Sequence, residues 1–97
     1  MAPGNVPLSF NRDRTERQLD ARLEELLAKL RKNRPSEDPW MVRRAYDIAA
    51  ERHREQLRKS GEPYLMHLLE VAHILADLRL DATTLTAALL QIGRAHV

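Results

Sequence analysis

The sequence predicts an all-α fold of four helices joined by short loops. Apolar residues recur three and four positions apart along most of the chain, which is the spacing of a helix with one buried face. No stretch shows the alternation of apolar and polar residues that is typical of a strand. Segments 33–36 and 58–63 are rich in polar residues, proline and glycine, and they divide the helical pattern into separate elements.

The first helix is expected from about residue 13 to residue 32. Residues 1–12 contain two prolines and a glycine, so this segment is predicted to be a flexible tail. The second helix is expected over residues 38–57, after the break at Pro35. The apolar face of the first helix consists of Leu19, Leu23, Leu26, Leu27 and Leu30.

The third helix is expected over residues 64–78 and the fourth over residues 82–90. The third is apolar around most of its circumference, so it is expected to be buried on several sides. Asp81 stands directly before the fourth helix and is predicted to cap it, because an aspartate oxygen can accept the unsatisfied amide hydrogens of the first turn.

Length and composition limit what this chain can be. Its 97 residues suffice for one small domain, and the net charge of +2 is too small to indicate nucleic-acid binding by bulk electrostatics. No apolar run approaches the roughly 18 residues of a membrane span, and the N-terminus lacks the pattern of a secretory signal. The absence of cysteine excludes disulfides and thiolate metal sites. We therefore expect a cytoplasmic protein with neither a membrane nor a nucleic-acid partner.

The most specific part of the sequence lies between residues 45 and 90. It contains, in order, A-Y-x-x-A at 45–49, R-K-S-G-E-P-Y at 58–64, His67, V-A-x-I-L-A-x-L-x-L-D at 71–81 and T-x-x-A-A-L-L at 84–90. These pieces resemble the start of the hydrolase domain in the Rel/Spo family, whose bacterial members make and destroy guanosine tetra- and pentaphosphate. Residues 13–44 match the family only in helical character.

The resemblance implies the N-terminal portion of an HD-domain helical fold and removal of the 3′-pyrophosphate from guanosine 3′,5′-bis(diphosphate). It implies that His67 is a metal ligand, with manganese (Mn²⁺) as the metal, and that the loop residues Arg58, Lys59 and Ser60 bind the guanine nucleotide. Tyr64 is expected to pack rather than to touch the ligand. A GTP pyrophosphokinase activity and association with the ribosome are implied only for a full-length family member.

The chemistry of these side chains agrees with the implied roles. A divalent ion lowers the pKa of a bound water and polarises a phosphoryl oxygen, and a neutral imidazole on a rigid helix can be aimed at such an ion. Cations and a hydroxyl beside a tight glycine turn suit a highly anionic ligand. Without the resemblance, His67 is read as a histidine hydrogen-bonded to backbone, and Arg58 and Lys59 as ordinary helix-end cations.

No second metal ligand is evident near His67, although a catalytic metal site needs about three protein ligands. His73 lies six positions later, roughly 120° around the helix, so the two histidines are not expected to share an ion. Glu70 is one turn away and is read as a polar neighbour, and His53 has no ligand role in the family. Leu68 replaces the proline that usually follows the metal histidine, which predicts a looser start of this helix.

Residues 91–97 are interpreted as artificial. After T-x-x-A-A-L-L the family continues with a metal-binding His-Asp pair, whereas this chain reads Q-I-G-R-A-H-V. A common sequencing adapter contains ATC-GGA-AGA-GCA-CAC-GTC followed by a stop, and these triplets translate to the same residues as stand at 92–97. We therefore expect residues 13–90 to be a partial HD hydrolase domain and residues 91–97 to be a translated adapter. On this hypothesis the chain alone is inactive and binds manganese weakly.

Two alternatives stay open at this point. The first is a small helical interaction or nucleic-acid-binding module that uses surface cations, and salt-dependent binding to DNA or RNA would support it. The balanced charge and the specific R-K-S-G-E-P-Y stretch stand against it. The second is an HD phosphohydrolase that acts on another nucleotide. The cations of the first alternative are Arg31, Lys32 and Arg34, or Arg43 and Arg44.

Overall fold

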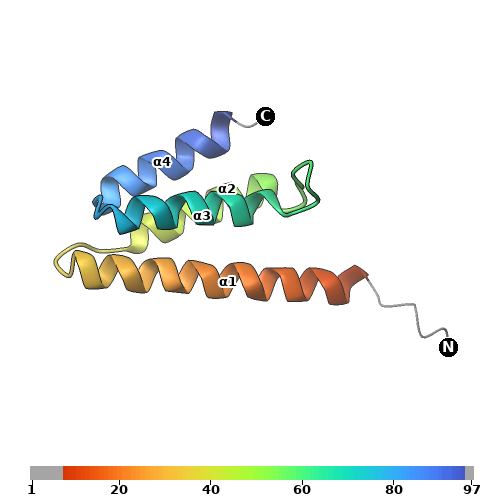
Figure 1. Ribbon diagram of the computed structural model, residues 1–97, viewed down its shortest axis with the longest axis horizontal. Helices are drawn as coiled ribbons and strands as arrows, with labels where there is room; N and C mark the ends of the chain where they lie inside the picture. The colour runs from red at the N-terminus through yellow and green to blue at the C-terminus, as the bar shows by residue number, and fades with distance from the viewer. Residues whose placement is uncertain (1–7, 96–97) are drawn as a thin grey trace.

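The described part of the chain folds into four α-helices around one core (Figure 1). The computed structural model describes the backbone of residues 8–95 and the side chains of residues 14–92. Over the described backbone there is no strand, only an isolated antiparallel bridge between Leu57 and Pro63. The helices are α1 (Leu8–Asn33), α2 (Trp40–His53), α3 (Tyr64–Asp77) and α4 (Ala82–Ala95). The predicted all-α architecture is therefore confirmed.

The first helix begins earlier than the sequence predicts. Helix α1 starts at Leu8, so the prediction of a flexible tail is wrong for residues 8–12. Pro7 is the last proline before the helix, and residues 8–12 contain neither proline nor glycine to interrupt it. The rest of the predicted tail, residues 1–7, lies outside the described residues.

The second and fourth helices also differ from their predicted ends. Helix α2 stops at His53 rather than at residue 57. The Gln56 amide bonds the carbonyl of His53, and the Gln56 carbonyl then accepts the amide of Tyr64, which draws residues 54–63 into a hairpin. Helix α4 continues to Ala95 instead of ending at residue 90, and Ile92 packs against the core. The hairpin contacts of Gln56 therefore accompany the early end of α2, and the packing of Ile92 accompanies the longer α4.

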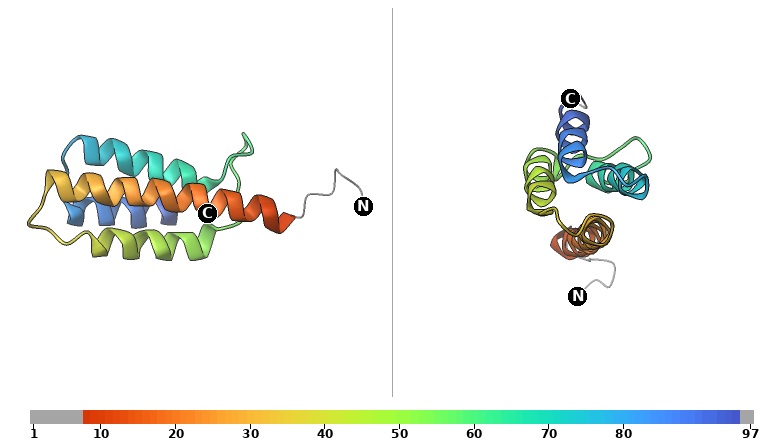
Figure 2. Two further views of the ribbon diagram at one scale, coloured as in Figure 1. Left: turned by 90° about the horizontal axis from the view of Figure 1, so that it is seen from below. Right: turned by 90° about the vertical axis from the view of Figure 1, so that its left-hand side faces the viewer.

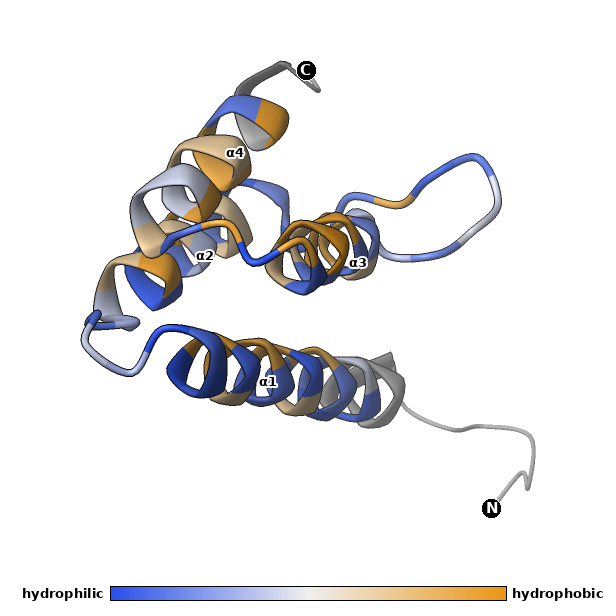
Figure 3. Cartoon of the chain, turned by 60° about the vertical axis from the view of Figure 1, so that its left-hand side comes forward, coloured by the Kyte–Doolittle hydropathy of each residue, from blue (hydrophilic) through white to orange (hydrophobic). Residues whose placement is uncertain are grey.

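The four helices pair in a specific way. Helix α2 packs mainly against α4, while α1 packs mainly against α3 (Figure 2). All five leucines of the predicted α1 stripe are buried, and the polar face of α1 points away from the other helices (Figure 3). The stripe therefore determines which side of α1 faces the bundle, because burying apolar surface is the main favourable term in packing. Among the described residues, no helix is both long enough and apolar enough to cross a membrane.

Helix α3 packs against α1, α2 and α4 but leaves one side exposed. Tyr64, Leu68 and Leu69 are fully buried, whereas Ile74 and Leu78 are 61% and 66% exposed. The expectation of burial on several sides is therefore met toward these three helices, whereas the side that carries Ile74 is exposed in the part of the chain that the structure describes. The looser helix start predicted from Leu68 is not observed either, since α3 is continuous from Tyr64 and the Leu68 side chain lies in the core.

The turn between α3 and α4 holds an arginine in the left-handed region. Helix α3 ends in a Schellman motif, in which Leu80 N bonds Leu75 O at 3.3 Å and Arg79 N bonds Ala76 O at 2.9 Å. Arg79 has a φ of 64°. A non-glycine residue in this conformation costs about 1 kcal/mol. The backbone conformation at position 79 therefore favours glycine, which has no Cβ, over arginine.

Asp81 caps α4 as predicted. Its Oδ1 accepts the backbone amide of Thr84 at 2.8 Å, and its carbonyl accepts the amide of Leu85 at 3.0 Å. Hydrogen bonds from Thr84 lower the pKa of the Asp81 carboxyl, since they favour its charged form. The cap thus fixes the start of α4 through a local interaction.

A second group of contacts joins the two loops at this end of the bundle. The Arg34 guanidinium donates to the Arg79 carbonyl at 3.0 and 3.2 Å and pairs with Glu37 at 3.1 Å. The other carboxylate oxygen of Glu37 accepts the amide of Ala82 at 2.8 Å. A side chain from the α1–α2 loop therefore supplies one of the hydrogen-bond acceptors that the start of α4 needs.

The buried Tyr46 predicts sensitivity to alkaline pH. Burial raises the pKa of Tyr46 to about 12, whereas a solvated tyrosine titrates near 10. The unfolded chain releases this proton at a lower pH than the folded chain does. The stability contributed by the protonated Tyr46 is therefore fully present below about pH 10 and is lost as the pH rises toward 12. We expect circular dichroism to show alkaline unfolding in this window, and Tyr46→Phe to unfold at higher pH. Coincident transitions of the two chains would contradict the assignment to Tyr46.

Candidate metal and nucleotide site

The hairpin between α2 and α3 carries the predicted nucleotide-binding residues. Arg58 N bonds the Glu62 carbonyl and Gly61 N bonds the Arg58 carbonyl, both at 2.8 Å, and these bonds close a tight turn. Gly61 has a φ of 92°, a conformation that favours glycine. At the base of the turn, the Tyr64 amide bonds the Gln56 carbonyl at 2.9 Å. The turn thus presents residues 58–60 from a hydrogen-bonded frame.

The side chains of Arg58, Lys59 and Ser60 face an open cavity. They line it together with Glu62, and its volume is about 470 Å³. The Ser60 hydroxyl is held by the Glu62 amide at 3.4 Å. Neither Arg58 nor Lys59 forms an ion pair or hydrogen bond through its side chain with any residue in the range 14–92. Both cations are therefore available to an anionic ligand.

His67 lies on α3 in the turn of helix that follows Tyr64. It is half-buried, and its imidazole makes no hydrogen bond with the side chains or backbone described between residues 14 and 92. The alternative reading, in which His67 is a histidine satisfied by backbone, is therefore not what the structure has. An imidazole without a protein partner keeps a ring nitrogen free for a metal ion or for water.

The other histidine of α3 has a different role, as the helical spacing predicts. His73 is 3% exposed and faces α1. Its Nε2 lies 3.0 Å from the Arg22 carbonyl, and its Nδ1 lies 3.0 Å from the Lys29 ammonium nitrogen. Because a carbonyl can only accept, Nε2 carries the hydrogen and Nδ1 accepts from Lys29. Both ring nitrogens of His73 are used, so His73 is not available to an ion at His67.

Glu70 and His53 are also engaged elsewhere. The Glu70 carboxylate accepts two hydrogen bonds from Arg22, at 2.6 and 3.1 Å. His53 contacts Gln56 at 2.6 Å and packs its ring against that of Tyr64, with the centroids 4.9 Å apart. The readings of Glu70 as a polar neighbour and of His53 as a residue without a ligand role agree with these contacts.

Tyr64 connects the hairpin with both helices of the candidate site. Its side chain is fully buried, as the packing role predicts, and burial raises the pKa of its hydroxyl. That hydroxyl donates to the Ile92 carbonyl on α4 at 2.9 Å. Position 92 on α4 therefore lies beside the first turn of α3, which also carries His67. The sequence carries no signal for this contact, because the two residues are 28 positions apart.

The residues present do not complete a metal site. Within the part of the chain that the structure describes, no three histidine, cysteine, aspartate or glutamate side chains come together as ligands. The Rel/Spo resemblance places the His-Asp pair at positions 91 and 92. This chain has glutamine and isoleucine there. An isoleucine cannot ligate an ion, so His67 would need ligands that residues 14–92 do not supply.

Comparison with known proteins assigns this chain to a family of hydrolases. The family model described as HD domain matches residues 45–93, which is half of the chain. HD domains are metal-dependent hydrolases. The chain belongs to the HD domain family, and the match covers α2, α3, the hairpin between them and most of α4.

The similar curated proteins are enzymes of guanosine tetraphosphate metabolism. The chain is 53% identical over 68 residues to the bifunctional (p)ppGpp synthase/hydrolase RelA of Mycobacterium tuberculosis. It is 50% identical over 68 residues to the guanosine-3′,5′-bis(diphosphate) 3′-pyrophosphohydrolase of Aquifex aeolicus. These alignments cover 70% of this chain but only 9% and 10% of the relatives. No solved structure matches. The resemblance to the Rel/Spo family is thereby confirmed.

Proposed function

We propose that this chain is part of a guanosine 3′,5′-bis(diphosphate) 3′-pyrophosphohydrolase. The observation that carries the proposal is the hairpin at 56–64, which presents two unpaired cations directly before the helix that bears His67. A guanosine tetra- or pentaphosphate carries several negative charges, and charge-assisted hydrogen bonds from Arg58 and Lys59 suit them. The names of the similar proteins support this substrate over another nucleotide. The proposed place of this activity is the cytoplasm, in agreement with the absence of cysteine.

The proposed roles of the side chains follow from their positions. Arg58 and Lys59 bind phosphate groups of the nucleotide, and the Ser60 hydroxyl adds a hydrogen bond at the edge of the same cavity. His67 is proposed as one ligand of a manganese ion in the intact protein. Since the other ligands are not among residues 14–92, we propose that this chain binds the nucleotide but does not hydrolyse it.

The nucleotide role can be tested by removing the hairpin cations. We expect Arg58→Ala combined with Lys59→Ala to weaken guanosine tetraphosphate binding at least tenfold in calorimetric titration, because two charge-assisted contacts are lost. The matched control is Arg44→Ala combined with Arg52→Ala, which removes the same charge from exposed positions of α2. Equal weakening in the two double variants would mean that only the net charge attracts the nucleotide, and the proposed site would be wrong.

The metal role can be tested by supplying the pair of ligands that the family resemblance specifies. We expect Gln91→His combined with Ile92→Asp to bind Mn²⁺ at least tenfold more tightly than the parent chain, measured by the electron paramagnetic resonance signal of free Mn²⁺. Adding His67→Ala should abolish the gain. Ile92→Asn alone is the control for polarity at this position. Tight one-to-one binding by the parent chain, or a gain that survives loss of His67, would contradict the proposal.

The origin of residues 91–97 remains a separate proposal. Their interpretation as a translated adapter rests on the match of residues 92–97 to the translation of that adapter, and sequencing of the genomic locus tests it. A locus that encodes Ile-Gly-Arg-Ala-His-Val followed by a stop would refute that interpretation without touching the roles of Arg58, Lys59 or His67.

A further inference from the structure

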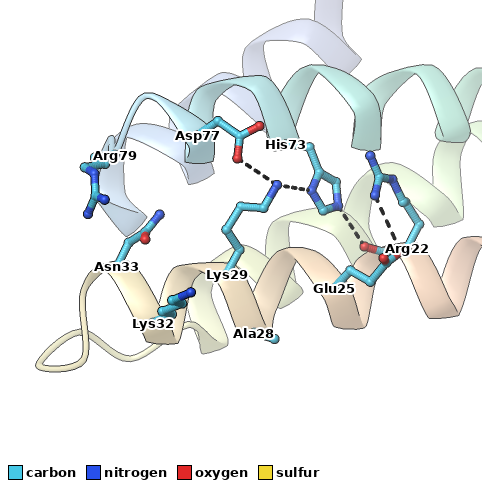
Figure 4. Close-up of a pocket in the computed structure, with 9 residues that line it drawn as sticks. All are labelled: Arg22, Glu25, Ala28, Lys29, Lys32, Asn33, His73, Asp77 and Arg79. Atoms are coloured by element: carbon cyan, nitrogen blue, oxygen red, sulfur yellow. Dashed lines mark hydrogen bonds and ion pairs between the residues drawn. The ribbon is translucent and has the colours of Figure 1, made fainter.

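A second cationic groove lies between α1 and the C-terminal half of α3, away from the hairpin (Figure 4). Its volume is about 570 Å³, which is within the usual range of small-molecule sites. The hairpin stands at the opposite end of α3 (Figure 1), so the two sites do not overlap. Its polar lining includes Lys29, Lys32, Asn33, His73, Asp77 and Arg79.

The carboxylates of this groove are already paired. Lys29 contacts Asp77 at 2.8 Å, and this hydrogen bond lowers the pKa of the Asp77 carboxyl. Glu25 lies 3.5 Å from Arg22. Each carboxylate that lines the groove therefore has a cationic neighbour, although Glu25 shares Arg22 with Glu70.

Two cations at the same groove have no such partner. The side chains of Lys32 and Arg79 form no ion pair or hydrogen bond with any residue between 14 and 92. Lys32 lies in the last turn of α1 and Arg79 follows the end of α3, and both line the groove (Figure 4). The groove consequently carries two unneutralised positive charges.

Hydrogen bonds to the helix-end carbonyls do not occupy these two cations. Lysine and arginine often lie near helix C-termini because the last carbonyls attract them. Here the Leu30 carbonyl at the end of α1 accepts the Arg34 amide at 2.8 Å. At the end of α3, the Ala76 carbonyl accepts the Arg79 amide and the Asn33 side-chain amide. Other groups thus satisfy these carbonyls, and the ammonium of Lys32 and the guanidinium of Arg79 remain free.

The backbone of Arg79 gives an independent reason to expect a ligand. Arg79 has a φ of 64° and stands just after the C-cap of α3, where glycine is the preferred residue. An unfavourable residue held at such a position is a reason to look for a function of its side chain. The guanidinium of Arg79 has no protein partner in the described residues, so its use would lie in contact with a ligand.

We propose that the α1–α3 groove binds a small phosphate-bearing anion through Lys32 and Arg79. Two phosphoryl groups, as in pyrophosphate, match the two free charges. The Asn33 side chain and the Lys29 ammonium lie between these cations and His73 in Figure 4 and line the same groove. This site is distinct from the hairpin and does not depend on the function proposed for it.

The test is a titration of the ¹⁵N-labelled chain with inorganic pyrophosphate, followed by amide chemical shifts. We expect saturable shifts in residues 28–33 and 77–80, and at least tenfold weaker binding after Lys32→Ala. Lys59→Ala is the control in the hairpin and should leave the groove shifts unchanged. If pyrophosphate did not bind in the groove, the result for nucleotide binding at the hairpin would therefore be unaffected. Shifts confined to residues 58–61, or unchanged affinity after Lys32→Ala, would overturn the proposal.

Arg79→Gly separates a ligand role from a structural role. Since glycine prefers this backbone conformation, the variant should melt about 4 °C higher than the parent chain. The same variant should bind pyrophosphate at least fivefold more weakly. A rise in melting temperature with unchanged affinity would remove Arg79 from the site. Groove shifts that appear only with single-stranded RNA, and not with pyrophosphate, would instead indicate a nucleic-acid surface and overturn the proposal.

Discussion

Leu68→Ala is expected to lower the free energy of unfolding by about 3 kcal/mol, because it removes a fully buried side chain and leaves a cavity. A domain of this size has a total stability of only about 5–10 kcal/mol. Much of the margin would therefore be lost through one substitution. Urea unfolding followed by circular dichroism at 222 nm measures the change.

The matched control for Leu68→Ala is Leu78→Ala, at the C-terminal cap of the same helix. The Leu78 side chain is 66% exposed, so the same chemical change should alter stability by less than about 0.5 kcal/mol. Equal effects at the two positions would show that α3 does not bury the side that the structure places in the core. A large loss at Leu78 alone would mean that another surface covers it.

Glu37→Ala is expected to cost about 2 kcal/mol. The substitution removes the acceptor of the Ala82 amide at the start of α4 and the ion-pair partner of Arg34. Ala82 is 3% exposed, so its amide would stay buried without a partner, and an unsatisfied buried donor costs about 1–3 kcal/mol. Thermal and urea unfolding would measure the loss.

Two companion variants show which contact of Glu37 matters. Glu37→Gln keeps an oxygen that can accept the Ala82 amide but removes the charge, so its effect should be about 1 kcal/mol or less. Glu51→Ala removes an exposed glutamate from α2 and should be nearly neutral. If Glu37→Gln were as damaging as Glu37→Ala, the ion pair with Arg34 rather than the cap of α4 would hold the two loops together.

The two groups of candidate residues differ in how well sequence reasoning could find them. Arg58, Lys59, Ser60 and His67 follow from the family resemblance, and among the side chains described at 14–92 the two cations and the imidazole have no protein partners. Lys32 and Arg79 belong to no such motif. They are 47 positions apart (79 − 32), and only the packing of α1 against α3 brings them to one groove.

Local features of the sequence determined the helices and their buried faces. The stripe from Leu19 to Leu30 has the period of an α-helix, and Asp81 caps the residues that directly follow it. Such signals are readable because they join residues within a turn or two of each other. They identified four helices and the loop at 58–63, although the ends of α1, α2 and α4 were misplaced.

Tertiary structure decided what depends on residues far apart. Helix α2 ends at His53 because the Gln56 carbonyl accepts the Tyr64 amide. At the start of α4, the Glu37 carboxylate accepts the Ala82 amide, and the Tyr64 hydroxyl donates to the Ile92 carbonyl further along α4. These partners meet only after the helices pack, and the spacing of apolar residues does not encode which loops come together. The sequence by itself therefore determined the elements and the candidate loop at 58–60, whereas the bundle determined the helix ends, the loop-to-loop contact at Glu37 and the second cationic groove.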